Sequence, residues 1–171
     1  MTEPLLQIIL GCVLLVAVVT DLRSYRIPNS LTVPAMAAGL LAHTLLDGQA
    51  GLIVSLKGLG LGLGLFLIFH LMGGMGAGDV KLMAAVGSFL GPEGVLSAVV
   101  VTGLLGGLYA SAAMVAHWGL RGTVQHIGAM LTMRALSHEA ALAATPGSQV
   151  QLRYSLVIGL GTLLSQMVVV L

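Results

Sequence analysis

Long apolar runs follow one another along the chain, separated by short polar or glycine-rich breaks. A helix needs about 20 predominantly apolar residues to cross a bilayer. Such a run is expected to be helical because a lone strand in lipid leaves its backbone groups unpaired. The pattern therefore predicts six membrane-spanning helices, over residues of about 5–20, 31–46, 52–72, 80–90, 95–118 and 154–171.

The stretch of residues 121–144 has a different pattern. Val124, Ile127 and Leu131 fall on one helical stripe, whereas Arg121 and other polar residues lie elsewhere. This distribution predicts an amphipathic helix on the membrane surface. The expected fold is an all-α membrane helix bundle that forms a single domain over residues 1–171.

The composition excludes other classes of protein. Of the 171 residues, 57% are hydrophobic and 8% are charged, whereas a soluble domain carries roughly 25% charged residues. A soluble enzyme and a disordered tail are therefore excluded. The formal net charge of +1, without a basic stripe, argues against nucleic acid as the main partner. The lone cysteine, Cys12, allows neither an internal disulfide nor a multi-cysteine zinc site.

Positive charges predict the orientation of the chain. With six spans, six of the seven Lys and Arg residues fall on one side of the membrane and Lys57 lies near the other. Because Lys and Arg favour cytoplasmic loops, the loops after the first, third and fifth spans are expected in the cytoplasm. The cytoplasmic residues are then Arg23, Arg26, Lys81, Arg121, Arg134 and Arg153.

Glycines alternate with leucine within the third predicted span. In a helix they form two pairs with a spacing of four, Gly58 with Gly62 and Gly60 with Gly64. Small residues at this spacing allow helices to approach closely in membranes. Both pairs are expected to face neighbouring helices.

Two acidic residues lie at the cytoplasmic ends of predicted spans, Asp21 after the first and Asp79 before the fourth. The chain returns to the same membrane face two helices later, so we expect the two carboxylates to approach each other. Ionisable groups at this depth are costly and mark functional sites. Two close carboxylates share one proton, so one can activate water while the other polarises a carbonyl. This chemistry requires no metal and no cofactor.

The helix dipole favours Asp79 as the base and Asp21 as the protonated partner, although the two roles exchange during turnover. Simpler interpretations also exist: Asp79 caps its helix, and Asp21 pairs with Arg23 or Arg26. We further expect His43 and His70 to bond to backbone carbonyls.

The glycine-rich segment before Asp79 resembles a known signature. Residues 76–79 (Gly-Ala-Gly-Asp), followed by Lys81, resemble the GxGDxK motif of type IV prepilin peptidases. Asp21, followed by residues 26–29 (Arg-Ile-Pro-Asn), is similar to that family's first catalytic aspartate and the segment after it. The residues that support the two motifs are Gly76, Gly78, Lys81, Arg26, Pro28 and Asn29.

The resemblance implies an aspartic endopeptidase of the bacterial inner membrane with Asp21 and Asp79 as the catalytic pair. Its substrates are expected to be prepilin-like precursors, from which it removes a short basic leader on the cytoplasmic side. Glycine at Gly76 and Gly78 is expected to let the substrate backbone approach.

Two departures from the family pattern refine this expectation. Larger members carry an N-terminal domain with paired cysteines that methylates the new N-terminus, so a chain without it is expected to be a peptidase only. The small size is similar to the subfamily that serves tight-adherence (Flp) pili. Residues 153–159 stand where many relatives have a proline-rich motif, and this departure is expected to touch neither aspartate.

The same residues are also compatible with other functions. A small transporter or channel would use Asp21 and Asp79 as ion or proton sites, and presenilin-like intramembrane proteases share the GxGD motif. A structural scaffold would use the glycine pairs only for assembly, and it would tolerate Asp79→Asn.

Overall fold

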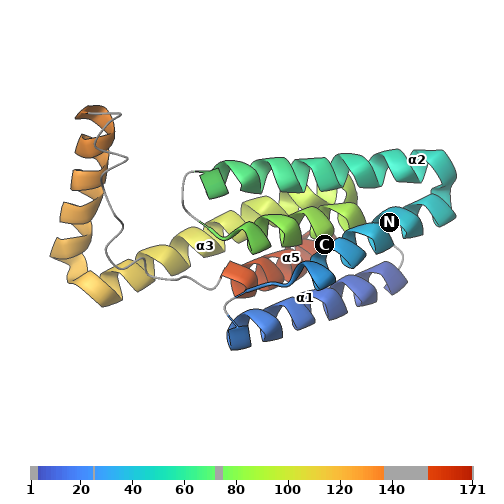
Figure 1. Ribbon diagram of the computed structural model, residues 1–171, viewed down its shortest axis with the longest axis horizontal. Coiled ribbons are helices and arrows are strands. Elements are labelled where there is room, and N and C mark those ends of the chain that lie inside the picture. Colours follow the sequence, from blue (N-terminus) through green and yellow to red (C-terminus); the bar gives the residue numbers. More distant parts are fainter. Residues whose placement is uncertain (1–3, 25, 72–74, 137–153, 171) are drawn as a thin grey trace. The chain divides into compact units, whose positions relative to one another are not determined.

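The computed structural model describes residues 4–24, 26–71, 75–136 and 154–170, and these residues form helices without any strand. The expected all-α fold is confirmed. Figure 1 shows the helices in chain order. They are α1 (Pro4–Ser24), α2 (Asn29–Leu71), α3 (Ala77–Leu136) and α5 (Tyr154–Val170).

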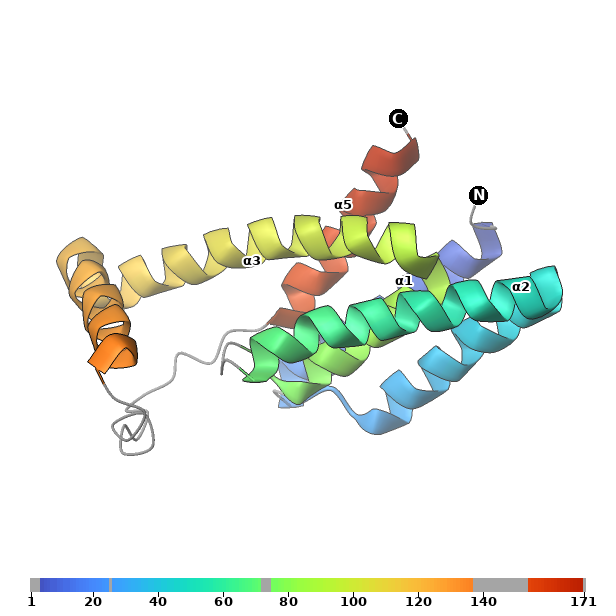
Figure 2. The same ribbon diagram turned by 90° about the horizontal axis from the view of Figure 1, so that it is seen from above.

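The long helix α2 is broken at Gly48, where φ is 60° and ψ is −137°. Glycine accommodates a positive φ because it has no Cβ atom. The chain reverses its direction at this point, so that residues 29–47 and 49–71 form a helical hairpin (Figures 1 and 2). This turn falls between the predicted spans of residues 31–46 and 52–72.

A second break occurs within α3 at Gly91, where φ is 71°. It lies between the predicted spans of residues 80–90 and 95–118, in the sequence Gly-Pro-Glu-Gly at residues 91–94. Every side chain of residues 82–89, just before this break, is buried. A helix that is buried on all sides belongs in the interior of a bundle, and Met83, Gly87 and Ser88 lie directly against glycines of α2.

The chain divides into two compact units, Met1–Gly106 with Arg153–Leu171, and Gly107–Leu152. In the first unit, α5 packs against α1. The second unit contains the last part of α3 as far as Leu136, with a positive φ of 71° at Gly119. Of the predicted surface helix, residues 121–136 are helical, and residues 137–144 lie outside the described residues.

The alternating glycines of α2 have two different environments. A Cβ atom at Gly58 would collide with the carbonyl oxygen of Gly87, and one at Gly62 would collide with that of Met83. Cβ atoms at Gly60 and Gly64 would meet nothing within 4 Å. The predicted contact is confirmed for the first pair and wrong for the second. At 3.6 residues per turn, positions two apart lie on opposite sides of a helix.

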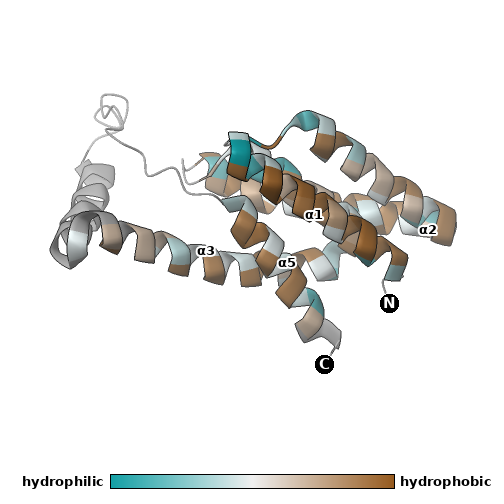
Figure 3. Cartoon of the chain, turned by 90° about the horizontal axis from the view of Figure 1, so that it is seen from below, coloured by the Kyte–Doolittle hydropathy of each residue, from teal (hydrophilic) through white to brown (hydrophobic). Residues whose placement is uncertain are grey.

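Large apolar side chains cover the outside of the helices, whereas several hydroxyl groups lie inside. Leu45 and Leu104 are 84% and 72% exposed, and Ser55 and Ser88 are fully buried. Figure 3 shows hydrophobic residues along most of α1, with hydrophilic residues at its C-terminal end. In the described part of the chain, three helices are long and apolar enough to cross a membrane, and a shorter apolar helix, Tyr154–Met167, adds a fourth candidate.

Candidate active site

Asp21 is buried because it lies on the inner face of α1. The buried residues before it, Leu10, Leu14 and Ala17, follow the spacing of three or four that brings side chains onto one helical face. Asp21 continues this stripe near the end of the helix and is only 9% exposed. The packing that buries the leucines therefore also buries the carboxylate.

Asp79 lies in the first turn of α3 and bonds to the residue at the start of that turn. Its Oδ2 atom accepts a hydrogen bond of 3.3 Å from the backbone N–H of Gly76, and its own N–H donates to the Gly76 carbonyl at 3.1 Å. A side chain at the third helical position that reaches back to the cap is half of a capping box. The prediction that Asp79 is the N-cap residue is therefore wrong. The N-cap residue is Gly76, and Asp79 lies three residues after it.

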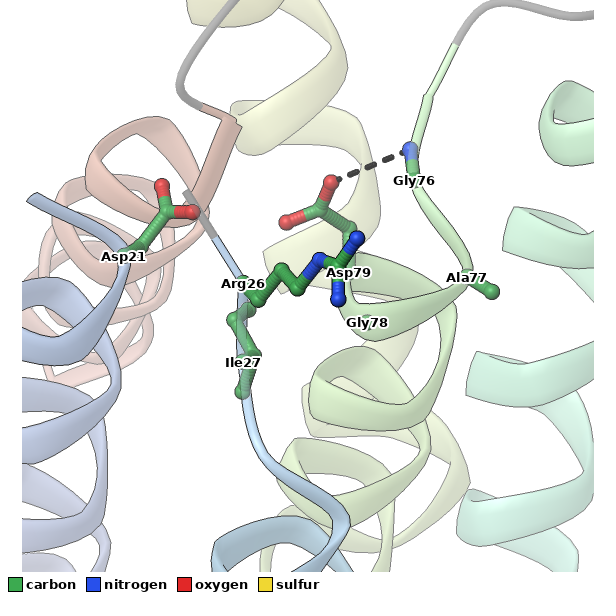
Figure 4. Close-up of a pocket in the computed structure, with 7 residues that line it drawn as sticks. All are labelled: Asp21, Arg26, Ile27, Gly76, Ala77, Gly78 and Asp79. Carbon is green, nitrogen blue, oxygen red and sulfur yellow. Dashed lines mark hydrogen bonds between the residues drawn. The ribbon is translucent and has the colours of Figure 1, made fainter. Parts of the chain in front are cut away.

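Asp21 and Asp79 line the same cavity of about 230 Å³. Figure 4 shows their carboxylates, one from α1 and one from α3, pointing toward each other across this space. The charge of Asp21 acts on Asp79, which is also 9% exposed. The remaining residues that line the cavity are Arg26, Ile27, Gly76, Ala77 and Gly78.

The predicted motif residues divide into two groups. Arg26, Gly76 and Gly78 line the cavity, and in Figure 4 the side chain of Arg26 extends from the segment after α1 toward Asp79. The other three residues form the connections that hold the cavity walls, and they are Pro28, Asn29 and Lys81.

The walls are joined by backbone and side-chain hydrogen bonds. The carbonyl of Pro28 accepts hydrogen bonds from the N–H groups of Leu31 and Thr32, at 3.1 and 3.3 Å, where α2 begins. The ammonium group of Lys81 donates to the Asn29 side-chain oxygen at 2.8 Å. The segment that follows Asp21 is therefore attached directly to the helix that carries Asp79.

The two motif glycines make room for different neighbours. A Cβ atom at Gly78 would lie 3.2 Å from the Cβ of Ile27, so glycine lets the segment after α1 approach α3 closely. A Cβ atom at Gly76 would lie 3.3 Å from Oδ2 of Asp79. Gly76 thus keeps the surroundings of the carboxylate open, whereas Gly78 serves the packing of Ile27.

The sequence analysis missed Ser155, which is part of this site. Its Oγ atom donates a hydrogen bond of 2.6 Å to Oδ2 of Asp21, from a position 134 residues further along the chain. The expectation that residues 153–159 touch neither aspartate is therefore wrong. The alternative in which Asp21 pairs with Arg23 or Arg26 is not found among the described residues, where Ser155 is the hydrogen-bond partner instead. Nothing in the sequence distinguishes Ser155 from other serines of the chain.

Both histidines bond to backbone carbonyls, as predicted. A ring nitrogen of His43 lies 2.9 Å from the Phe89 carbonyl oxygen, and one of His70 lies 2.8 Å from that of Met75. Neither histidine lines the cavity. In the described parts of the chain, no group of three or more His, Cys, Asp or Glu residues is arranged to hold a metal ion.

The described residues form apolar helices, and two buried acids line a small cavity between them. The chain belongs to the type IV leader peptidase family, whose sequence profile matches residues 8–111. The match includes both aspartates and both motifs, and it ends before α5.

Three curated relatives are named prepilin leader peptidase/N-methyltransferase. The protein of Bacillus subtilis (strain 168) is 36% identical over 109 residues, which are 59% of this chain and 41% of the relative. That of Xanthomonas campestris pv. campestris is 33% identical over 110 residues, 61% of this chain and 38% of the relative. That of Burkholderia pseudomallei (strain 1026b) is 34% identical over 104 residues, 57% of this chain and 33% of the relative. The chain thus spans about two fifths or less of these relatives' length, and no solved structure matches it.

Proposed function

We propose that this chain is a prepilin leader peptidase, an aspartic endopeptidase with Asp21 and Asp79 as its catalytic pair. The observation that carries the proposal is that these two acids, whose flanking residues resemble the family's motifs, line one cavity. The peptidase part of the relatives' names supports this activity. Within the family, we propose that the chain belongs to the short subfamily that serves tight-adherence pili.

The chemistry of the pair requires one carboxylate and one carboxylic acid. The ionised member takes a proton from a water molecule in the cavity, and the water oxygen attacks the scissile carbonyl carbon. The protonated member gives its proton to the carbonyl oxygen, which forms a neutral tetrahedral diol. The acid that took the proton from water then gives it to the leaving nitrogen, while the other carboxylate takes a proton from a hydroxyl of the diol. The C–N bond breaks, and the products are a new amine and a carboxylic acid.

The position of the cavity suits a substrate that is half in the membrane. It lies where α1 ends and α3 begins, at the ends of two apolar helices. An apolar substrate helix can lie beside the bundle in lipid while the junction with its leader reaches Asp21 and Asp79. The substrate class in this proposal is a prepilin-like precursor with a short basic leader.

The breaks at Gly48 and Gly91 support the finer topology of six spans, because each divides one long helix into two. In this topology the protein is a multi-pass protein of the bacterial inner membrane. The end of α1 and the start of α3 then face the cytoplasm, as the distribution of Lys and Arg favours. The active site opens on that side.

A transporter or channel is the alternative from a different class. It would need carboxylates near mid-bilayer, whereas Asp21 and Asp79 lie at helix ends. A presenilin-like intramembrane protease is the closer alternative because it shares the GxGD motif. A cleavage site in the polar leader junction supports our proposal, and one within the apolar helix supports the presenilin-like function.

The deciding experiment is coexpression with a prepilin precursor, followed by separation of precursor and product on a gel. We expect wild-type protein to convert the precursor, and Asp21→Asn and Asp79→Asn to reduce the rate to below about one thousandth. Glu93→Gln, the same kind of change at an exposed acid, is the control and should leave the rate unchanged. Full processing by either aspartate variant contradicts the catalytic pair. No processing by wild type contradicts the function.

A further inference from the structure

We propose that Ser155 is a positioning residue that holds the Asp21 carboxylate for the peptidase reaction, an inference that rests on the proposed function. Its hydroxyl donates a 2.6 Å hydrogen bond to Oδ2 of Asp21. Ser155 is fully buried, and Asp21 is 9% exposed. Short hydrogen bonds to a carboxylate are among the stronger ones in proteins. Ser155 does not line the cavity, so it acts through Asp21 rather than on the substrate.

The packing of α5 against α1 places the two side chains opposite each other. A Cβ atom at Gly159 would lie 3.4 Å from a methyl group of Val18, so the two helices meet closely at this level. Ser155 lies four residues before Gly159, and Asp21 lies three residues after Val18. These spacings keep each pair on one face of its helix. Ser155 and Asp21 therefore meet in the next layer of the same helix interface.

Close contact with α3 holds the other side of α5. A Cβ atom at Gly161 would collide with Thr102, and one at Gly106 would lie 3.3 Å from the ring of Tyr154. These contacts limit rotation of α5 between its two neighbours. The Ser155 hydroxyl is thus presented to Asp21 by packed helices, which hold a site more precisely than loops do.

The bond has a stereochemical consequence for the catalytic pair. Oδ2 of Asp21 is engaged by Ser155, and Oδ2 of Asp79 is engaged by the N–H of Gly76. An oxygen that accepts a hydrogen bond from a fixed donor is a poor place for the shared proton. In Figure 4, the Asp79 oxygen that is free of Gly76 points toward Asp21. The shared proton and the attacking water are therefore directed to the remaining oxygens, between the two acids.

The test compares Ser155→Ala, Ser155→Thr and Ser165→Ala as purified full-length proteins in detergent, with a prepilin precursor as the substrate. Ser165 is a matched control on the same helix, because it is buried and its hydroxyl bonds to the carbonyl of Thr162 within α5. We expect Ser155→Ala to lower kcat by about 10- to 100-fold with little change in KM, the range for losing a hydrogen bond to a charged group. Ser155→Thr keeps the donor and should restore most of kcat, and Ser165→Ala should resemble wild type.

Thermal unfolding of each variant separates positioning from folding. A loss of kcat in Ser155→Ala at an unfolding temperature close to that of Ser165→Ala supports the inference. In the Asp21→Asn background, Ser155→Ala should cause no further loss. Unchanged kcat in Ser155→Ala, or equal losses in both alanine variants, overturns the inference while the proposed function stands. A wild-type protein that cleaves no precursor overturns the proposed function, and with it any catalytic role of Ser155.

Discussion

The ammonium group of Lys81 donates a 2.8 Å hydrogen bond to the side-chain oxygen of Asn29, across 52 positions of the chain. This bond joins the two motifs, because Asn29 begins α2 just after the segment that follows Asp21, and Lys81 lies in the first turns of α3 after Asp79. The two walls of the cavity are thereby connected at their outer edge. The bond joins a cation to a neutral acceptor, and its role can be tested by exchanging either partner.

We expect Lys81→Met to slow precursor cleavage by about fivefold or less, the effect of one partly exposed hydrogen bond. Asn29→Leu should have a similar effect, whereas Asn29→Asp should retain activity because it replaces the bond with an ion pair. The measurement is the cleavage rate of purified variants, with Lys57→Met as the control for losing an exposed cation. If the loss of cleavage rate in the Lys81→Met/Asn29→Leu double variant equals the product of the two single losses, the two residues act independently.

Gly78→Val is expected to lower the cleavage rate by about tenfold or more, because its side chain would press on Ile27, which already lies 3.2 Å from a Cβ atom at this position. Adding Ile27→Ala should recover part of the rate by making room. Gly103→Ala, at a position of α3 where a Cβ atom meets nothing within 4 Å, is the control. Steady-state cleavage assays test this prediction, and failure of Ile27→Ala to recover any activity argues against the packing explanation.

Gly58→Ala and Gly60→Ala form a matched pair on one helix. The first places a methyl group against the backbone of Gly87, and we expect it to destabilise the protein by about 1–3 kcal/mol. The second enters open space and should be neutral or stabilise the helix by up to about 1 kcal/mol. Thermal unfolding in detergent measures both. Equal unfolding temperatures for the two variants would mean that α2 does not pack through Gly58.

The proposed topology predicts different labelling of two engineered cysteines in a Cys12→Ser background. Gln49→Cys lies at the tip of the α2 hairpin and Arg23→Cys near the end of α1, and both native residues are exposed. We expect a membrane-impermeant maleimide to label position 49 in cells with a permeable outer membrane, and position 23 only after the inner membrane is opened. Labelling of both positions from the same side contradicts the six-span topology.

The sequence alone was enough to predict the class of protein and the two acids of the candidate site. Apolar runs and the scarcity of charge indicate a helical membrane protein because lipid leaves the backbone few other ways to satisfy its hydrogen bonds. Asp21 and Asp79 stand out because ionisable residues are rare in such a chain and each lies within a recognisable local motif. The breaks at Gly48 and Gly91 were also predictable, since turn residues interrupt the apolar pattern there.

The contacts between distant residues depend on the packing of the helices. Ser155 and Asp21, like Lys81 and Asn29, bond across large separations that local motifs do not encode. The glycines show the same limit, because Gly58 and Gly60 have similar neighbours in the sequence but only Gly58 faces another helix. The physical reason is that helices apolar on all sides carry little information about which face turns inward. That choice depends on close packing, which the whole bundle determines together.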